Sequence, residues 1–506
     1  MSGDGADSLP ASWATECLGN LDVAIFDGPF GSHLKTSDYV DSGVRVIRLE
    51  NIGQGRFIDE NQSFVSKEKY DDIRKHTVVP GDIVFSSFVT ESIRSALVPS
   101  HIPFAVNKAD CFGIHFRGET TDSKFVQFFL QSRSAHRQVE GMIHGVGRPR
   151  INTSQLKELV VPVAPTREQT RIVAKIEELF SELDKGVEAL TATREQLAMY
   201  EQSVLRQAFD GTSTAAWREK NRGTVGSPDA HIAQLKRERE AYSRRCQRLA
   251  AISPIVPVEG KDGDDRYLPA AWTRVKLNDL ALDSVLGKML DRKKNKGRPR
   301  TYLGNINVRW GRFDVDSTKT MPIEDGEVDR YSLKCGDLVI CEGGEPGRCA
   351  VWEGADDEVF VQKALHRVRL PKSYNPYFAY YYLVYAHGAG LLERAYTGTT
   401  IKHLTGIGLA DVCFPLCSFA EQTEVVRRLQ EALSLANELT TSIDGELLRA
   451  QGVRQSILKQ AFTGQLIAQN AKDEPASVLL ERIRAEQEGT TAKRKPAIKS
   501  GKKKGA

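Results

Sequence analysis

The sequence lacks the features that mark membrane, secreted and zinc-binding proteins. No run of about 18 consecutive apolar residues, the length a membrane-spanning helix needs, occurs in the chain. The first residues, MSGDGADSLPASW, contain no apolar core of a signal peptide. The eight cysteines form no CxxC pair and no His/Cys set at zinc spacing. These absences predict a cytoplasmic protein with reduced cysteines and no metal.

Signals of catalysis are also scarce. The run EGGEPGR (342–348) has no Gly-Lys-Ser/Thr and is not a nucleotide P-loop. The carboxylates show no PD…ExK nuclease spacing, and the histidines are scattered singly. Asn375–Phe378 (NPYF) is similar to the proline-aromatic motif of amino-methyltransferases. It lacks the second proline, however, and no glycine-rich cofactor loop follows a strand upstream. A binding protein is favoured, with a DNA adenine methyltransferase kept as an alternative.

The chain does contain a long stretch with helical periodicity, residues 166–211. Thr166 is suited to cap the start, and Glu168 and Gln169 in the first turn are expected to reach back toward free N–H groups. Gly211 is suited to end the helix in a left-handed conformation. Apolar residues between these ends recur in steps of four and three, which is typical of a coiled-coil seam.

This helix is present twice. Glu421-Gln422 repeats Glu168-Gln169, and SILKQAFTG (456–464) repeats SVLRQAFDG (203–211), both at an offset of 253 residues. The matched length favours an internal repeat over two unrelated amphipathic helices of an ordinary core. The residues predicted to form the seam are Ile176, Phe180, Leu183, Val187, Leu190 and Leu197 in the first helix and Leu429, Leu433, Ile443 and Leu447 in the second.

The repeat extends to the segments that precede each helix. LPASWATECLGNL (9–21) matches LPAAWTRVKLNDL (268–280), and Gly81–Val84 matches Gly336–Val339. Asn51-Ile52 is matched to Asn305-Ile306. Short β-branched runs bounded by Gly or Pro, such as Leu338–Cys341, predict strands, and together with segments of helical spacing they predict a mixed α/β globule in each half.

The predicted domains follow from this pattern. They are a first globule (1–165), a first long helix (166–211), a linker with a charged helix (212–267), a second globule (268–417), a second long helix (418–464) and a C-terminal segment with a short helix and a basic tail (465–506).

Basic residues cluster, although the net charge is only +4. The densest cluster, DRKKNKGRPR (291–300), suits a phosphate backbone, and arginine can also contact guanine; a solvated surface loop is the alternative. GRPR recurs at 147–150, and GPFGSHLK (28–35) is a glycine-bounded turn that could hold a phosphate. Arg94 and Arg348 match each other and either point at DNA or pair with nearby carboxylates. The candidate DNA-binding residues are Ser32, His33, Lys35, Arg94, Arg148, Arg150, Lys293, Lys294, Lys296, Arg298, Arg300 and Arg348.

Taken together, these strings resemble the specificity subunit of type I restriction–modification enzymes over nearly the whole chain. The strings that carry the resemblance are GPFGSHLK, PGDIVF, GRPRINTSQLKELVVPVAPTREQTRIV and VLRQAFDG in the first half, and YLGNINVRWGRF, CGDLVICEGGEPGRCAVW, TGTTIKHLTGIGLADVCFP and ILKQAFTGQL in the second. In the TIKH string, Lys402 and His403 become further candidates for DNA binding.

The resemblance implies a function without catalysis. Each globule would be a target recognition domain that reads one half of a bipartite DNA site. The two helices would pair antiparallel and fix the gap, and would dock two methyltransferase subunits, which the restriction and translocase subunits join. S-adenosylmethionine, ATP and Mg²⁺ would bind in those partners and not in this chain. A coiled-coil scaffold that does not read DNA remains an alternative.

Overall fold

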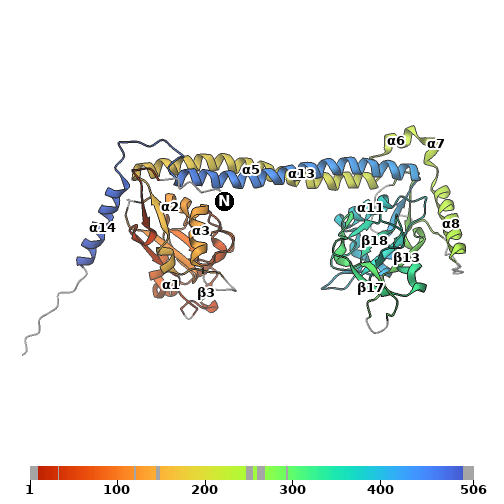
Figure 1. Ribbon diagram of the computed structural model, residues 1–506, viewed down its shortest axis with the longest axis horizontal. Helices are drawn as coiled ribbons and strands as arrows, with labels where there is room; N and C mark the ends of the chain where they lie inside the picture. The colour runs from red at the N-terminus through yellow and green to blue at the C-terminus, as the bar shows by residue number, and fades with distance from the viewer. Residues whose placement is uncertain are drawn as a thin grey trace, which may run out of the picture. The chain divides into compact units, whose positions relative to one another are not determined.

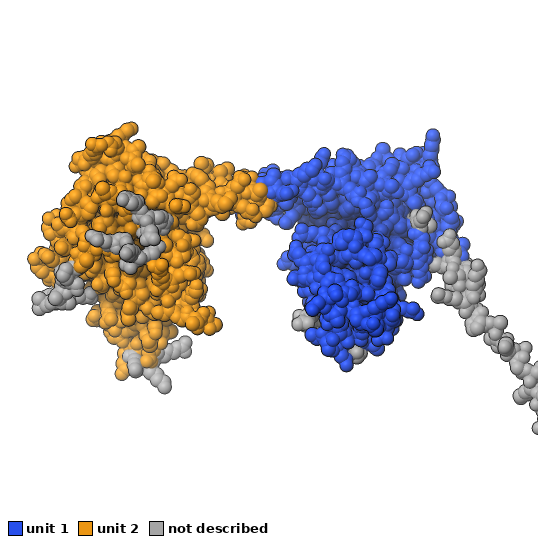
Figure 2. All heavy atoms as spheres, turned by 180° about the vertical axis from the view of Figure 1, so that it is seen from behind, with its two compact units in different colours: residues 1–190, 444–506 blue, residues 191–443 orange. Residues whose placement is uncertain are grey.

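The computed structural model describes residues 9–31, 33–118, 121–143, 149–246, 255–258, 268–291 and 295–493. The chain forms two compact units (Figure 2). Unit 1 contains residues 1–190 and 444–506, and unit 2 contains residues 191–443. Each unit combines one globule with part of each long helix, so the predicted domain boundaries, which set the helices apart, stay predictions. None of the described helices is both long and apolar enough to cross a membrane.

The two predicted long helices are present and equal in length (Figure 1). Helix α5 spans Thr166–Phe209 and helix α13 spans Phe419–Phe462, with 44 residues each. Gly211 and Gly464 follow them with φ of +76° and +72°, the left-handed conformation that glycine adopts without strain. Sequence periodicity therefore located both helices and their ends.

The expected role of the Glu-Gln pairs at the helix starts is wrong. Glu168 accepts hydrogen bonds from the Trp13 indole (3.0 Å) and from Gln469 (2.7 Å). Gln169 accepts one from the Asp122 amide (3.0 Å) and donates one to the Ala164 carbonyl (2.8 Å). These buried side chains attach the helix to its globule, because a buried polar group needs partners and the globule supplies them.

The helices pack antiparallel, as each unit shows by itself. In unit 1 the start of α5 shares a core with the end of α13, including Ile176 with Leu458. In unit 2 the end of α5 shares a core with the start of α13, including Leu205 with Leu429. The predicted fold class, mixed α/β globules with an antiparallel pair of long helices, is confirmed.

Globule 1 is built on three sheets. Strands β1 (Ala14–Cys17) and β11 (Val160–Val163) pair where the globule joins α5. A four-stranded antiparallel sheet has the order β2-β10-β7-β8, with β2 Val23–Phe26, β10 Cys111–Phe116, β7 Ile83–Ser86 and β8 Ser95–Leu97. A five-stranded sheet has the order β3-β5-β4-β9-β6, with β3 Tyr39–Val40, β5 Ser63–Val65, β4 Val44–Ile47, β9 Ala105–Asn107 and β6 Thr77–Val78.

Globule 1 also contains short helices. They are α1 (Lys67–Ile73), α2 (Ser123–Leu130), α3 (Arg133–Met142) and α4 (Thr153–Lys157). The phenylalanines of α2 lie in the core that α5 and α13 complete in unit 1.

Globule 2 repeats the central frame. Strands β12 (Thr273–Lys276) and β24 (Cys413–Leu416) pair as β1 and β11 do. The sheet β13-β21-β18-β19 repeats the four-stranded sheet, with β13 Asp283–Leu286, β21 Leu365–Arg369, β18 Leu338–Cys341 and β19 Cys349–Val351.

The remaining sheets of globule 2 differ from those of globule 1. A three-stranded sheet has the order β17-β14-β20, with β17 Lys319–Ile323, β14 Arg298–Leu303 and β20 Phe360–Val361. Two hairpins are β15 (Val308–Arg309) with β16 (Arg312–Phe313) and β22 (Tyr396–Thr397) with β23 (His403–Leu404). The helices are α9 (Leu277–Leu280), α10 (Val328–Tyr331), α11 (Pro376–Gly388) and α12 (Gly406–Ala410).

A further helix follows each long helix and docks within its own unit. In unit 2, α6 (Ala215–Lys220) and α7 (Arg222–Val225) lead to α8 (Pro228–Arg245), where Arg239 lies 3.8 Å from Asp279 of globule 2. In unit 1, α14 (Ala476–Lys493) begins with a hydrogen bond from the Ala476 amide to the Ser12 carbonyl (2.9 Å). Both lie where the sequence predicted helices.

One match made from the sequence is corrected by the hydrogen bonds. Asn51 accepts from the Arg48 amide and donates to the Ile58 carbonyl, and Asn307 makes the equivalent bonds with Gly304 and Asp314. Asn51 therefore corresponds to Asn307 and not to Asn305. The repeated Asn-Ile letters misled the comparison, because the turn geometry depends on the asparagine that closes it.

Candidate nucleic-acid interface

The basic segment of globule 2 is not entirely a surface loop, because its last residues, from Arg298 onward, belong to strand β14. Lys293 and Lys294 lie outside the described residues. The exposed side chain of Lys296 comes just before β14, and its amide donates to Glu324 (3.0 Å). Arg298 is 79% exposed, 4.0 Å from Asp325, whereas Arg300 is 27% exposed, 3.0 Å from the same carboxylate. The segment thus presents Lys296 and Arg298 to solvent and holds Arg300 against the protein.

The buried Lys288 helps to hold this segment in place. Lys288 forms ion pairs with Glu324 and Glu327, and only a small part of its surface is exposed. Burial opposes its charge, but the hydrogen bonds that Lys288 donates to the two glutamates raise its pKa above the usual value. The pKa of Glu324 is lowered, first by the neighbouring Glu327 side chain and then by the hydrogen bonds that Glu324 accepts from Lys288 and the Lys296 amide. Glu324 therefore holds its charge beside Lys288 and the Lys296 amide, which helps to fix the segment that carries the exposed cations.

A second group of candidates meets at the glycine-rich loop of globule 2. Arg348 donates to Glu345 (3.0 Å) and to the Asn305 carbonyl (3.1 Å). Asn305 in turn donates to the Gly343 carbonyl (2.8 Å). Arg348 is therefore held inside this loop by a carboxylate and a carbonyl, and its half-buried side chain ties two loops together.

Lys402 and His403 lie on the neighbouring β22–β23 hairpin. The Leu404 amide donates to the Glu342 carbonyl (2.7 Å), which joins this hairpin to the glycine-rich loop. Lys402 is 3.3 Å from Glu393, and His403 is exposed. Ile401 beside them is 66% exposed, so the hairpin tip offers an apolar side chain next to two polar ones.

The candidates of globule 1 are less closely gathered. Ser32 and Arg148 lie outside the described residues. His33 and Lys35 are exposed on the turn after Phe30, and the Lys35 amide donates to Asp38 (2.6 Å). Arg94 donates to the Leu49 carbonyl (3.3 Å) and the Ser86 hydroxyl (3.0 Å), the counterpart of the Arg348 arrangement.

Arg150 occupies the place in globule 1 that His403 has in globule 2. The Ile151 amide donates to the Ser87 carbonyl (3.0 Å), as the Leu404 amide donates to that of Glu342. Arg150 of the first GRPR string therefore corresponds to His403 of TIKH, which the sequence comparison did not recognise. Arg150 is 62% exposed, and Asp110 lies 3.8 Å from it.

Sequence analysis did not assign three further exposed cations near these loops. Arg309 and Arg312 face each other across the β15–β16 hairpin, and the Gly311 amide between them donates to the Cys349 carbonyl (3.0 Å). Lys363 lies in the turn before β21, where Ala364 has a φ of +79°. The available signals were two repeated strings, Gly-Arg-Phe at 55–57 and 311–313 and Lys-Ala at 108–109 and 363–364.

The methyltransferase-like string has a structural role here. Asn375 caps helix α11, because its side chain accepts from the Tyr377 amide (2.9 Å) while its own amide donates to Gln422 (2.7 Å). Phe378 lies in the core. The side-chain oxygen of Asn375 is thus engaged in starting a helix.

Among the predicted seam residues, Ile176 and Phe180 share a core with the end of α13 in unit 1, and Leu429 and Leu433 share one with the end of α5 in unit 2. Ile176, Phe180, Leu429 and Ile443 are buried, and the others in the set are half-buried. Arg454 reaches across within unit 1, pairing with Asp184 and lying 4.1 Å from the centre of the Phe180 ring. A charged side chain thus covers the edge of the seam.

Comparison with known proteins gives one consistent result, although no family model matches the sequence. The chain is 22% identical over 511 residues to the type I restriction enzyme EcoKI specificity subunit of Escherichia coli K12, covering 98% of this chain and 100% of that protein. It is 23% identical to the StySPI specificity subunit of Salmonella potsdam, covering 98% of each. The resemblance to type I specificity subunits is therefore confirmed over nearly the whole chain.

A solved structure supports the fold. A chain from a study of complex assembly and conformational transition of the type I restriction–modification system superposes with a TM-score of 0.63 at 17% identity. The superposition covers 91% of this chain and 100% of that chain.

Proposed function

We propose that this chain is the non-catalytic DNA-recognition subunit of a type I restriction–modification enzyme. Each globule reads one half of a bipartite DNA target, and the paired helices set the distance between the halves. The chain docks two methyltransferase subunits and, through them, the restriction and translocase subunits. S-adenosylmethionine, ATP and Mg²⁺ bind in those partners.

The observation that carries the proposal is one frame used twice with different exposed loops. Both globules contain the four-stranded sheet. The segments that carry Arg150 and His403 are held by equivalent backbone hydrogen bonds, from Ile151 to Ser87 in globule 1 and from Leu404 to Glu342 in globule 2. The side chains at matching places differ, as Arg150 and His403 do. Base edges in the major groove are distinguished by which donors and acceptors face them. Two unlike globules can therefore read two unlike half-sites, which two identical ones could not.

Exposed cations in each globule support contact with DNA. Lys296 and Arg298 in globule 2 and Lys35 and Arg150 in globule 1 reach solvent. Contacts to phosphate give affinity and orientation, and contacts to bases give specificity. The fixed strand beneath Arg298 would present its guanidinium in one orientation.

Exposed apolar residues on the helices support docking of partner proteins. In unit 2 they include Met199, Leu435 and Leu439, and in unit 1 they include Leu448 and Val453. Since each unit contains a stretch of both helices, two copies of one partner could find related surfaces. Adenine methylation requires the base to leave the stack, and DNA held by this subunit would help a docked methyltransferase to reach it.

The test is a genome-wide map of adenine methylation in a host that expresses this chain with its methyltransferase subunit. Residues 268–416 are exchanged for the same segment of a relative with another specificity. We expect a bipartite methylated motif in which the exchange alters one half and leaves the other half and the gap unchanged. A matched exchange of residues 9–162 is the control and should alter the opposite half.

An active complex that methylates no bipartite motif would contradict the proposal. So would a motif that is indifferent to both exchanges, because the globules would then not read the DNA.

A further inference from the structure

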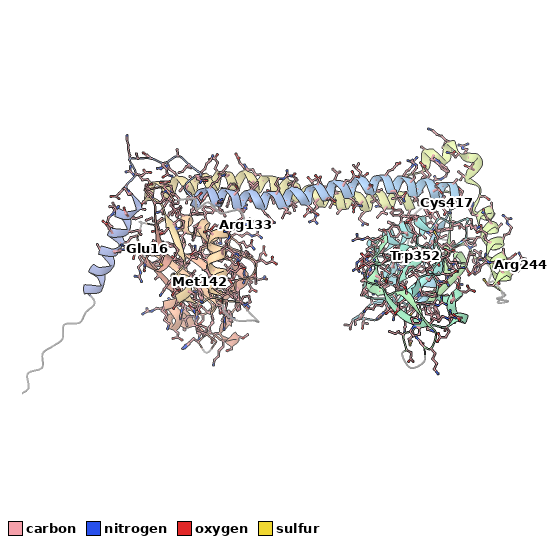
Figure 3. The ribbon with its side chains drawn as sticks, in the orientation of Figure 1. Glu16, Arg133, Met142, Arg244, Trp352 and Cys417 are labelled. Carbon is pink, nitrogen blue, oxygen red and sulfur yellow. The ribbon has the colours of Figure 1, made fainter. Side chains whose placement is uncertain are left out.

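Unit 1 contains a pocket of about 620 Å³ between globule 1 and the last turns of α13. Figure 3 labels Arg133 at this edge of globule 1, close to the long helices. The walls come from α2, α3 and β11 on one side and from α13 on the other. The residues that line the pocket include Ser132, Arg133, Arg137, Val160, Gly452, Ser456 and Phe462.

The aromatic cluster in the corresponding part of unit 2 is larger. Phe209 at the end of α5 contacts Phe378 and Tyr382, each with ring centroids 5.3 Å apart, and also stacks on Tyr385 at 5.5 Å. In unit 1, Phe462 at the end of α13 contacts Phe125 at 5.1 Å and Phe129 at 5.3 Å.

The missing ring in unit 1 follows from a single position. Asp122 and Asn375 cap α2 and α11 and donate their amides to Gln169 and Gln422, which fixes an offset of 253 between the two helices. At this offset, Tyr385 corresponds to Ser132.

Ser132 ends one helix and caps the next. Its hydroxyl accepts from the Ala135 amide (3.2 Å) at the start of α3. Helix α11 instead continues through the equivalent place to Gly388. Among the described residues of unit 1, no third ring contacts Phe462, and the pocket opens there.

The pocket also carries positive charge, and its helical wall lacks a side chain at one position, Gly452. Arg133 and Arg137 are exposed, and neither has an ion-pair partner among residues 9–493 as far as the structure describes them. Gly452 of α13 faces open space, and its counterpart in α5 is Met199. Val160 remains 42% exposed on the floor of the pocket.

We propose that this pocket receives an aromatic side chain, flanked by carboxylates, from a segment of the docked methyltransferase subunit. The inference rests on the proposed function. An aromatic ring would stack on Phe462 as Tyr385 stacks on Phe209, and acidic neighbours would meet Arg133 and Arg137. Buried aromatic anchors supply much of the binding energy at protein interfaces. In unit 2 the ring of Tyr385 occupies the equivalent place. The two methyltransferase copies therefore bind with unequal affinity.

The test fills the pocket in the full-length chain with Gly452→Met, which places a large side chain on the helical wall of the pocket. Gly445→Met is the matched control, another helical glycine of α13 with open space around it but outside the pocket. Each variant is titrated with purified methyltransferase subunit by calorimetry, and native mass spectrometry counts the bound copies. We expect roughly 30-fold weaker binding of one copy for Gly452→Met, and no change for Gly445→Met.

A charge test and a crosslink identify the occupant. Arg133→Glu with Arg137→Glu should weaken the same copy, whereas Arg167→Glu on an exposed part of α5 should not. Benzoyl-phenylalanine at Ser456 in the assembled complex should crosslink to a methyltransferase peptide that contains an aromatic residue beside Asp or Glu. A crosslink to residues 1–8 of this chain, or to DNA, would overturn the proposal.

The outcomes separate the two proposals. If the unmodified chain directs no bipartite methylation, the proposed function fails. If methylation is bipartite but Gly452→Met binds both copies as the unmodified chain does, only the pocket proposal fails.

Discussion

Equivalent residues of the two units satisfy the same need with different partners. Glu168 and Glu421 are both buried at the start of a long helix. Glu168 accepts from the Trp13 indole, whereas Glu421 accepts from Arg218 (2.9 Å) and the Thr214 hydroxyl (2.8 Å). A buried carboxylate tolerates either solution provided that donors reach it. The repeat thus constrains the position of a polar group more than the identity of its partner.

Glu424 gives the start of α13 a pH dependence. Its pKa is lowered to about 2, chiefly by hydrogen bonds from Arg427 and then from Arg428. Arg428 also donates to the Ser213 carbonyl (2.5 Å), which ties α13 to the segment after α5. A carboxylate with a lowered folded-state pKa stabilises the fold above its ordinary pKa, and this contribution is lost as the pH falls through the lowered value.

We therefore expect Glu424→Gln to lower the stability of this contact by about 0.5–1 kcal/mol at pH 7, a modest value because both arginines reach solvent. The difference from the unmodified chain should shrink between about pH 4.5 and pH 2, where the native carboxylate is itself protonated. Hydrogen exchange of α13 amides across this range measures it. A difference that stayed constant with pH would exclude an ionic origin.

Arg298 and Arg348 should contribute to DNA binding in different ways. Arg298→Ala removes an exposed cation, so binding of the assembled complex should weaken about equally for all sequences, and the slope of log K against log salt should fall by about 1. Arg348→Ala is the comparison. It removes a side chain held by Glu345 and Asn305, so it should lower the stability of globule 2 and leave the slope unchanged. Equal slopes for Arg298→Ala and the unmodified chain would contradict phosphate contact by Arg298.

At the scale of elements, the long helices carry glycines that their packing does not require. Gly186 lies in the middle of α5, and a Cβ added there would meet no atom within 4 Å. Gly211 differs, since its φ is +76° and an added Cβ would lie 2.4 Å from the Pro269 ring. Gly186 is tolerated within the helix, whereas Gly211 is needed for the left-handed backbone conformation that follows the end of the helix.

Gly186→Ala should stabilise α5 by about 1 kcal/mol, because alanine loses less conformational freedom in a helix. Gly211→Ala should destabilise unit 2 through backbone strain and the close contact with Pro269. Thermal unfolding of the two variants side by side tests both signs. A destabilised Gly186→Ala protein would show that this glycine has a packing role.

At the scale of the whole molecule, the equal length of the two helices is the feature on which spacing depends. Each has 44 residues, about 66 Å at 1.5 Å per residue. A helix that belongs to both units can transmit a change in its own length to whatever the units bind. The proposed gap in the DNA target therefore becomes a property of the helices and not of the globules.

Removing residues 187–193 from α5 together with 444–450 from α13 should shorten the gap. The two segments are each one heptad, so the seam keeps its phase. Seven residues correspond to about 10 Å of helix, or about 3 base pairs at 3.4 Å each. Methylation mapping should show both half-sites retained with a shorter gap. Deletion of one segment alone is the control, and it should abolish activity because the helices no longer match. An unchanged gap in the double deletion would show that the helices do not set the distance between the half-sites.

Much of the architecture is local in origin, and so the sequence alone determined it. Helices α5 and α13 were located because apolar periodicity and terminal glycines are short-range signals. Strand β18 was predicted at Leu338–Cys341, where it lies, because a buried β-branched run needs few distant contacts to be recognised. The doubled frame followed from offsets alone.

Only the tertiary structure decided which polar groups are free and where space remains. From the sequence, Arg348 is a candidate for DNA contact, but in the structure it is engaged by Glu345 and the Asn305 carbonyl. Asn51 matches Asn305 by its letters but Asn307 by its hydrogen bonds. The pocket of unit 1 exists because Ser132 stands where unit 2 has Tyr385. Each of these depends on residues brought together from distant parts of the chain, and sequence periodicity carries no record of such contacts.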